Sequence, residues 1–415
     1  MAEGAVSGDA TSGASLFAMP DYRRLWAAGA LTGCARWLEF IALGIFAYEL
    51  TRSPQLVALL AVLRMMPYVA LGFIVGALAD RFDRRRLLIG STAFVAAVAT
   101  LMCVLTANKL AGYAAVAMAT MVSGAFWTID MPVRRRLLAD FAGPGRLSRA
   151  LGFDNSTNYA TRAIGPLIGG ITYQMLGIEG IYALIAMAYG TCLVLAVGLS
   201  GRVEAESRSR VSTGLLAALR VPWSLILERR FIVIMGVTLV YNLFCFPFTS
   251  MVPVISQKDF LLEPRFVGAM SACEGIGGTL GAILVGRLGS ERTLFRTYYF
   301  GTVTLLLLML GLSWHLEVGT AVGALILMGA AAACFSATQY ALVHVISPPE
   351  VRGRVTGVLS LFIGTSMLGH YLAGQLFERL ASPDAIRVMA VAGLALMAAC
   401  GIAWWTAKPR IDTSP

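Results

Sequence analysis

Apolar residues gather in long runs along this chain, separated by short segments that contain glycine and charged residues. Most runs reach about 20 residues, the length of helix that crosses the hydrocarbon core of a bilayer. The runs predict twelve spanning helices, at about 25–50, 56–79, 87–107, 110–132, 150–177, 180–200, 231–255, 266–286, 294–314, 318–346, 355–378 and 385–406. We therefore predict an all-α polytopic membrane protein.

Composition agrees with this prediction, because 58% of the residues are hydrophobic and only 13% are charged, against roughly 25% charged in a soluble domain. The formal net charge of +10 comes largely from arginines at the ends of the apolar runs. Such charges set the orientation of a membrane protein and do not indicate nucleic-acid binding. The seven cysteines are scattered singly, so we expect no metal site and no cofactor.

The loops alternate in charge. Assigning every second loop and both ends of the chain to one side places most of the 33 Lys and Arg residues there. By the positive-inside rule that side is the cytoplasm. We therefore predict a monomeric multi-pass protein of the bacterial inner membrane with both termini cytoplasmic.

A long polar segment divides the apolar runs into two sets of six. The expected organisation is a disordered cytoplasmic tail over 1–22, a first six-helix bundle over 23–200, a central cytoplasmic loop over 201–226, a second bundle over 227–406 and a short tail over 407–415. The two halves also show weak similarity at a shift of about 204 residues, which indicates an internal repeat.

The loop between the second and third runs reads Gly76-Ala-Leu-Ala-Asp80-Arg81-Phe-Asp83-Arg84-Arg85-Arg86-Leu-Leu88. It resembles the corresponding loop of the major facilitator superfamily of transporters, with Asp83 at the position of a family glycine. Because Asp tolerates a positive φ better than most residues, we expect the turn to survive. The resemblance implies two pseudo-symmetric six-helix bundles that rock around a central site, with Gly76, Asp80, Arg81, Arg84 and Arg85 in a loop that stabilises the outward-open state.

The fifth run carries a second motif. Gly152, Gly165, Pro166, Gly169 and Gly170 resemble the pattern of drug/proton antiporters in this superfamily, with Thr161 replacing one glycine. Small residues let a helix pack closely against its neighbour. Importers of the superfamily tend to lack this motif, so the resemblance favours export. The segments that begin at Asp21 and Arg134 resemble the branch that includes macrolide and siderophore (enterobactin-type) exporters.

Ionisable residues inside spans are costly and therefore candidates for function. Arg36 and Glu39 are three residues apart, so they lie on one helix face and could neutralise each other. Either Glu39 is a proton-binding carboxylate that Arg36 holds or releases, or the charges form a permanent ion pair that joins span 1 to a neighbouring helix. Arg64 has no partner within a turn and needs one from another helix. The other interior candidates are a polar stripe of Asp154, Asn158 and Arg162 on the fifth span, and Glu274 on the eighth.

Two further groups follow from the resemblance. Asp130, near the cytoplasmic end of the fourth span, either latches onto Arg84 or Arg85 in one state or is a solvated helix-end carboxylate. Spans 1, 4, 7 and 10 line the cavity in this family, so the candidate substrate contacts, each of which could instead be packing, are Trp127, Asn158, Tyr241, Asn242, Gln339 and Tyr340.

The sequence does not indicate an enzyme, because it has no phosphate-binding loop, H-E-x-x-H or G-x-S-x-G motif. We expect proton-coupled efflux of a small organic molecule such as a drug or siderophore. The partners would be that substrate, protons and the lipid bilayer, with no nucleic acid. The alternatives are an importer or facilitator of a small metabolite, and a non-transporting membrane receptor.

Overall fold

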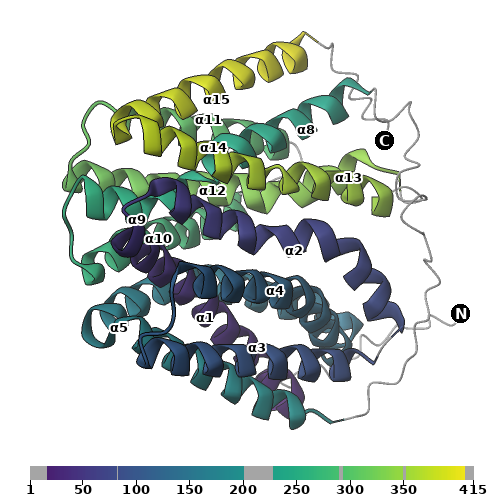
Figure 1. Cartoon of the computed structure of the whole chain (residues 1–415). Helices are drawn as coiled ribbons and strands as arrows, with labels where there is room; N and C mark the ends of the chain where they lie inside the picture. The colour runs from purple at the N-terminus through teal and green to yellow at the C-terminus, as the bar shows by residue number, and fades with distance from the viewer. Residues whose placement is uncertain (1–15, 82, 201–227, 289–292, 349–351, 407–415) are drawn as a thin grey trace, which may run out of the picture.

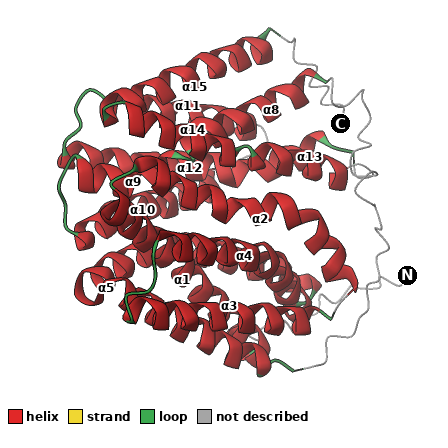
Figure 2. Cartoon of the chain, viewed as in Figure 1, coloured by secondary structure: helices red, strands yellow, loops and turns green. Residues whose placement is uncertain are grey.

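A computed structural model describes residues 16–81, 83–200, 228–288, 293–348 and 352–406 of the chain. All regular structure in these ranges is helical, and none of the described residues forms a β-strand (Figure 2). The prediction of an all-α membrane protein is therefore confirmed.

Among the described residues, the first half contains five long helices. They are α1 (Pro20–Thr51), α2 (Pro54–Arg81), α3 (Arg84–Ala107), α4 (Tyr113–Ala142) and α5 (Leu147–Val197), with short 3-10 turns at Leu16–Ala18 and Pro144–Arg146.

In the described part of the second half there are eight α-helical segments. They are α8 (Arg229–Val240), α9 (Phe248–Lys258), α10 (Pro264–Leu288), α11 (Leu294–Leu312), α12 (Val318–Ile346), α13 (Arg352–Gly364), α14 (Ser366–Arg379) and α15 (Ser382–Trp405), with a π-helical turn at Tyr241–Cys245 between α8 and α9.

Ten helices within the described ranges are long and apolar enough to cross a membrane, and the apolar part of α2, Pro54–Ala70, is a shorter eleventh. The twelfth passage comes from α5, which contains two predicted spans. Gly177 interrupts α5 with φ 64° and ψ −164°, a conformation that essentially only glycine adopts. This break lies at the predicted boundary between spans five and six.

The chain reverses direction at Gly177. Near the beginning of α5, Ala150 accepts a hydrogen bond from Tyr22, and just beyond its end Gly198 accepts one from Arg24. Both ends of α5 therefore lie beside the start of α1, and its two arms run antiparallel. Figure 1 shows the helices of the first half below those of the second half, with α2 and α9 between them.

The start of the folded chain lies earlier than predicted. Residues 16–22 were expected to belong to a disordered tail, but Leu16 and Tyr22 are fully buried in a small core with Leu137 and Leu138 of α4. The aromatic ring of Phe17 also packs against Trp26 and Phe153. The apolar side chains of this segment are buried against α4 at the end of the bundle. The segment is therefore folded, and α1 begins at Pro20. Residues 1–15, 201–227 and 407–415, which include most of the other predicted tails and the central loop, lie outside the described residues.

The turn between α2 and α3 also differs from the expectation. Asp83 has φ −58°, so it does not use the left-handed region. Its carboxylate instead accepts a hydrogen bond of 2.8 Å from the backbone N–H of Arg86. Asp83 is thus the N-cap of α3, a position at which Asp is among the most favoured residues.

Candidate functional site

The most deeply buried ion pair in the first half joins α1 to α2. Arg64 Nη2 lies 2.8 Å from Glu39 Oε2, and the Glu39 side chain is only 2% exposed. Ser123 of α4 donates to the other carboxylate oxygen at 2.8 Å. Glu39 therefore does not pair with Arg36 in this conformation. It forms the other expected arrangement, an ion pair that joins the first span to a neighbouring helix, and it is the partner that Arg64 required.

Arg36 points away from Glu39 and lies among aromatic rings. Its guanidinium carbon is 5.3 Å from the ring centroid of Trp37 and 4.8 Å from that of Trp127. Its Nη2 donates a hydrogen bond of 2.6 Å to Asn158 of α5. Trp127 in turn stacks on Tyr68 of α2 at 6.4 Å. Arg36 thus connects α1, α4 and α5, and it does so largely through uncharged groups.

Two arginines of α4 hold the first residue of the polar stripe on α5. Asp154 accepts from Arg134 at 2.5 Å and from Arg135 at 3.0 Å. Arg134 also lies 3.3 Å from Asp130, one helical turn earlier. Each carboxylate and guanidinium in this network therefore has a charged partner, which is the condition under which such groups tolerate burial.

The latch between Asp130 and the loop before α3 is not formed in this conformation. Asp130 is buried and pairs with Arg134. Arg84 pairs with Asp140 at 2.8 Å, and Arg85 donates to the backbone oxygen of Val197 at 2.7 Å. Gly76, Asp80 and Arg81 belong to the last turns of α2, and their side chains lie outside the described part of the structure.

The remaining charged residue of the stripe joins the two halves. Arg162 of α5 forms a short ion pair with Glu274 of α10. Thr249 of α9 donates to the same carboxylate at 3.2 Å. The side chains of Arg162 and Glu274 are 17% and 12% exposed, so this pair is less buried than the one between Glu39 and Arg64.

The stripe therefore faces the protein interior, as expected, but its three members have separate partners. Asp154 binds α4, Asn158 binds α1 and Arg162 binds α10. Sequence spacing places the three on one helix face. It does not show that their partners come from three different helices.

The candidate substrate contacts of the second half make contacts within their own bundle. Tyr241 stacks on Phe335 at 3.7 Å, and Asn242 donates to the backbone oxygen of Thr238 at 2.9 Å. Gln339 lies 3.4 Å from the hydroxyl of the same threonine. Tyr241, Asn242 and Gln339 are buried, whereas the fourth candidate, Tyr340, is 46% exposed. In this conformation Tyr340 is thus the most accessible of the four.

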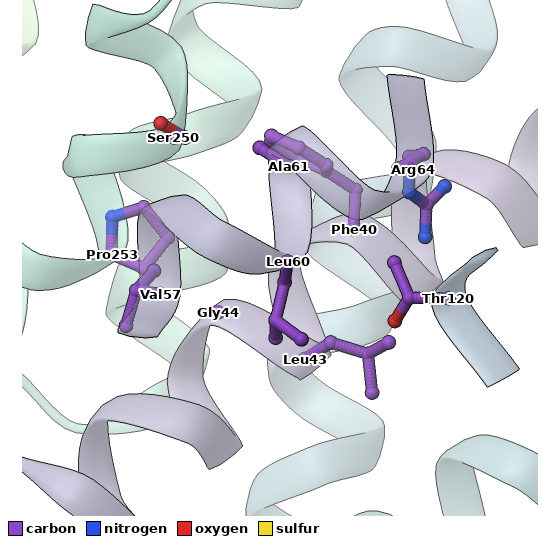
Figure 3. A pocket seen from close by; sticks show the side chains of 10 residues that line it. All are labelled: Phe40, Leu43, Gly44, Val57, Leu60, Ala61, Arg64, Thr120, Ser250 and Pro253. Atoms are coloured by element: carbon purple, nitrogen blue, oxygen red, sulfur yellow. The ribbon is translucent and has the colours of Figure 1, made fainter. Parts of the chain in front are cut away.

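Two small cavities lie beside these charges. The first, between α1, α2, α4 and α9, has a volume of about 20 Å³ and is lined by Arg64 and Thr120 on one side and Ser250 and Pro253 on the other (Figure 3). The second, between α1, α4 and α5, is also about 20 Å³ and includes Arg36 in its lining. Each has room for about one water molecule, so neither holds a complete organic substrate.

The glycines of the α5 motif contact two different neighbours. A Cβ added at Gly165 would lie 2.7 Å from Trp37 Cβ, and one at Gly169 would lie 3.0 Å from the Leu38 oxygen, so these two permit close packing on α1. Gly170 instead meets Gly268 of α10 in the second half. Pro166, which follows Gly165 in the motif, is also buried. Gly152 has open space around its Cβ position.

Sequence reasoning missed three residues of these networks. Ser123 and Thr249 each donate to a buried glutamate, but isolated hydroxyl residues in apolar helices carry no distinctive signal. Trp37 contacts both Arg36 and Arg162, the latter at 4.9 Å. Its position beside a predicted interior arginine was a usable signal, because arginine often lies over a tryptophan face.

The profile of the Major Facilitator Superfamily matches residues 25–369 of the chain. The Staphyloferrin A transporter of Staphylococcus aureus is 23% identical over 283 residues, which cover 67% of this chain and 70% of that protein. Macrolide efflux protein A of Streptococcus pyogenes is 20% identical over 366 residues, covering 86% and 89%.

Solved structures show the same fold. The nucleoside transporter NupG has a TM-score of 0.68 at 14% identity, covering 93% of this chain and 99% of that one. A bacterial homolog of the human lysosomal transporter Spinster, in an inward-facing and unoccupied conformation, has a TM-score of 0.70 at 13% identity, with 93% and 96% covered. From the profile match, which spans most of the residues described above, we conclude that the chain is a multi-pass membrane transporter of the Major Facilitator Superfamily.

Proposed function

We propose that the protein exports a small organic molecule, such as a drug or siderophore, from the bacterial cytoplasm in exchange for protons. The named relatives that support this proposal are a macrolide efflux protein and a staphyloferrin A transporter. The glycine motif of α5 and its close packing on α1 and α10 also support it.

Orientation follows from the arginine-rich loops. Arg84, Arg85 and Arg86 lie where α2 ends and α3 begins, and we assign this end of the bundle to the cytoplasm of a cell with an inner membrane. Hydrogen bonds join the halves at the opposite end, where Ser53 and the backbone of Gln55 donate to Glu378. With that orientation, the described conformation is closed toward the outside, and both termini are cytoplasmic.

The observation that carries the coupling proposal is the ion pair between Arg162 and Glu274. The pairs of Glu39 and Asp154 lie within the first half, so a rigid-body movement of the halves leaves them intact. The pair of Glu274 joins the halves and must break if they separate at that level. Removing one partner of a buried pair costs about 3–5 kcal/mol, and protonation of Glu274 avoids leaving its charge unpaired.

A proton gradient supplies enough energy for this cycle. One charge that crosses roughly 100 mV releases about 2.3 kcal/mol, which supports about fiftyfold accumulation of cargo. Glu274 is therefore our first candidate for the proton-binding carboxylate, with Glu39 and Asp154 next.

The test uses purified protein in sealed vesicles that contain a pH-sensitive dye. Antibiotics and siderophores are offered one at a time, and the internal pH is recorded with and without an imposed proton gradient. We expect wild type to move protons with at least one cargo and Glu274→Gln to bind that cargo without moving protons. Asp384→Asn is the matched control, because Asp384 is exposed and pairs with Arg387 of its own helix.

The other results separate the alternatives. Proton movement by Glu274→Gln at the wild-type rate refutes the role of Glu274 and directs the test to Glu39→Gln. Cargo movement that does not depend on the proton gradient indicates a facilitator. Cargo movement toward the side of the vesicle membrane that corresponds to the cytoplasm indicates an importer. No movement of any cargo leaves a non-transporting receptor as the better account.

A further inference from the structure

Arg36 differs from the other arginines in the interior of the first half. Arg64 pairs with Glu39, Arg134 pairs with Asp154, and Arg162 pairs with Glu274 across the halves. Within the described ranges of the chain, no carboxylate forms an ion pair with Arg36. Its polar side-chain contact is the neutral amide of Asn158.

The cavity beside Arg36 has an excess of positive charge. Five charged side chains line it, and they are Arg36, Arg134, Arg135, Asp130 and Asp154. Because the two aspartates are already bound by Arg134 and Arg135, one positive charge is left over. That charge is on Arg36. The lining contains three cations against two anions, so the cavity is electrostatically suited to one additional anion.

Two buried donors in the lining of this cavity also lack an acceptor. They are the Nε of Arg36 and the indole nitrogen of Trp127. The ring of Trp127 contacts the Arg36 guanidinium. Buried N–H groups nearly always have a partner in folded proteins, and two exceptions in the lining of one cavity indicate a missing acceptor.

The ring contacts and a water molecule do not replace that acceptor. Contact with two indole faces offsets only part of the cost of burying a cation. A water molecule fits the cavity of about 20 Å³ and can accept from one donor, but it leaves the charge uncompensated. A carboxylate both carries the opposite charge and offers about four acceptor positions.

We propose that Arg36 and Trp127 form an anion subsite that binds a carboxylate group of the cargo, so that the transported molecule is an organic acid. The cavity has room for one carboxylate oxygen, and the rest of the cargo extends toward Arg135, whose side chain is 33% exposed. This inference rests on the proposed transport function, but binding can be measured without transport.

The test compares three probes with the same ring and different charge. Benzoate is an anion, benzamide is neutral and benzamidine is a cation. Their binding to the full chain in lipid nanodiscs is measured by calorimetry and by the shift in unfolding temperature. We expect benzoate to bind and to raise the unfolding temperature of wild type, and benzamide and benzamidine to do neither.

Variants connect the binding to the subsite. Arg36→Gln should weaken benzoate binding by about tenfold or more, because it removes the charge-assisted hydrogen bonds. Trp127→Phe keeps an aromatic face over Arg36 but removes one donor, and it should weaken binding by about fivefold. This second variant keeps the test valid if Arg36→Gln does not fold. Arg265→Gln, which changes an exposed arginine, should bind benzoate as wild type does.

Equal binding of benzoate and benzamidine would overturn the proposal, as would benzoate binding that Arg36→Gln and Trp127→Phe leave unchanged. An equal stabilisation by sodium chloride would also overturn it, because the subsite would then hold a small inorganic ion. If benzoate binds as expected but the vesicles transport nothing, the transport proposal fails and the anion subsite stands. If a cationic cargo is transported and benzoate does not bind, only the subsite fails.

Discussion

Gly170 allows the two halves to touch, and its replacement by alanine should shift the protein away from the described conformation. A Cβ at this position would lie 2.5 Å from the backbone oxygen of Pro264 and 2.9 Å from the Cα of Gly268. Both neighbours are backbone atoms of the second half, so no side chain can rotate away. Only movement of α5 relative to α10 relieves the contact.

The size of the effect follows from this geometry. Reaching an ordinary contact distance requires the helices to separate by roughly 1 Å. Inserting a methyl group into a packed interface costs about 1–3 kcal/mol. In an alternating-access cycle this cost applies to the state in which the halves touch and is relieved when they separate. Gly170→Ala should therefore raise the population of the separated state by about 5–150-fold.

The assay measures distances between spin labels on the two halves. Labels at Leu110 and Lys258 occupy exposed positions at the end where the halves meet, in a background that lacks the seven native cysteines. We expect Gly170→Ala to increase the fraction of long distances. Gly152→Ala in the same helix is the matched control, because its added methyl meets open space. The reasoning is refuted if Gly170→Ala leaves the distances unchanged or if Gly152→Ala shifts them equally.

Three predictions concern stability, measured as the free energy of unfolding in detergent. Arg64→Leu leaves the Glu39 carboxylate buried without a cation and should cost about 3–5 kcal/mol, whereas adding Glu39→Leu should recover most of the loss; no recovery would show that the pair is not the cause. Gly177→Ala places a side chain at φ 64° and should cost about 1–3 kcal/mol, and a wild-type value would contradict the strained turn. Asp140→Asn breaks a partly exposed ion pair with Arg84 and should change stability by less than about 1 kcal/mol; a larger loss would mean that this loop depends on the pair.

Much of the architecture could be predicted from local sequence. A helix must be about 20 residues long to cross a bilayer, so the apolar runs located the spans, and the run boundary near Gly177 marked the reversal within α5. Interior charges were also recognisable, because an arginine or glutamate in an apolar run is conspicuous. The family was identifiable from the loop before α3, whose spacing is local, and the profile match bears this out.

The partners of the interior residues were not predictable in the same way. Arg36 and Glu39 are neighbours on α1, yet Glu39 pairs with Arg64 of α2 and Arg36 lies against Trp127 of α4. Likewise, the motif glycines of α5 indicated close packing. Only the structure showed that Gly169 packs against α1 and Gly170 against α10.

The physical reason is that the surroundings of a membrane helix are apolar on every side. In a soluble protein, the contrast between core and water gives each helix an apolar face that indicates its rotation. Lipid is as apolar as the interior of the bundle, so these helices lack that signal and are oriented by packing of small residues and by polar contacts. The sequence by itself therefore determined how many helices cross the membrane and roughly which residues form each one. Tertiary packing decided how each helix is rotated, and hence that Arg36 is the interior arginine without a carboxylate partner among the described residues.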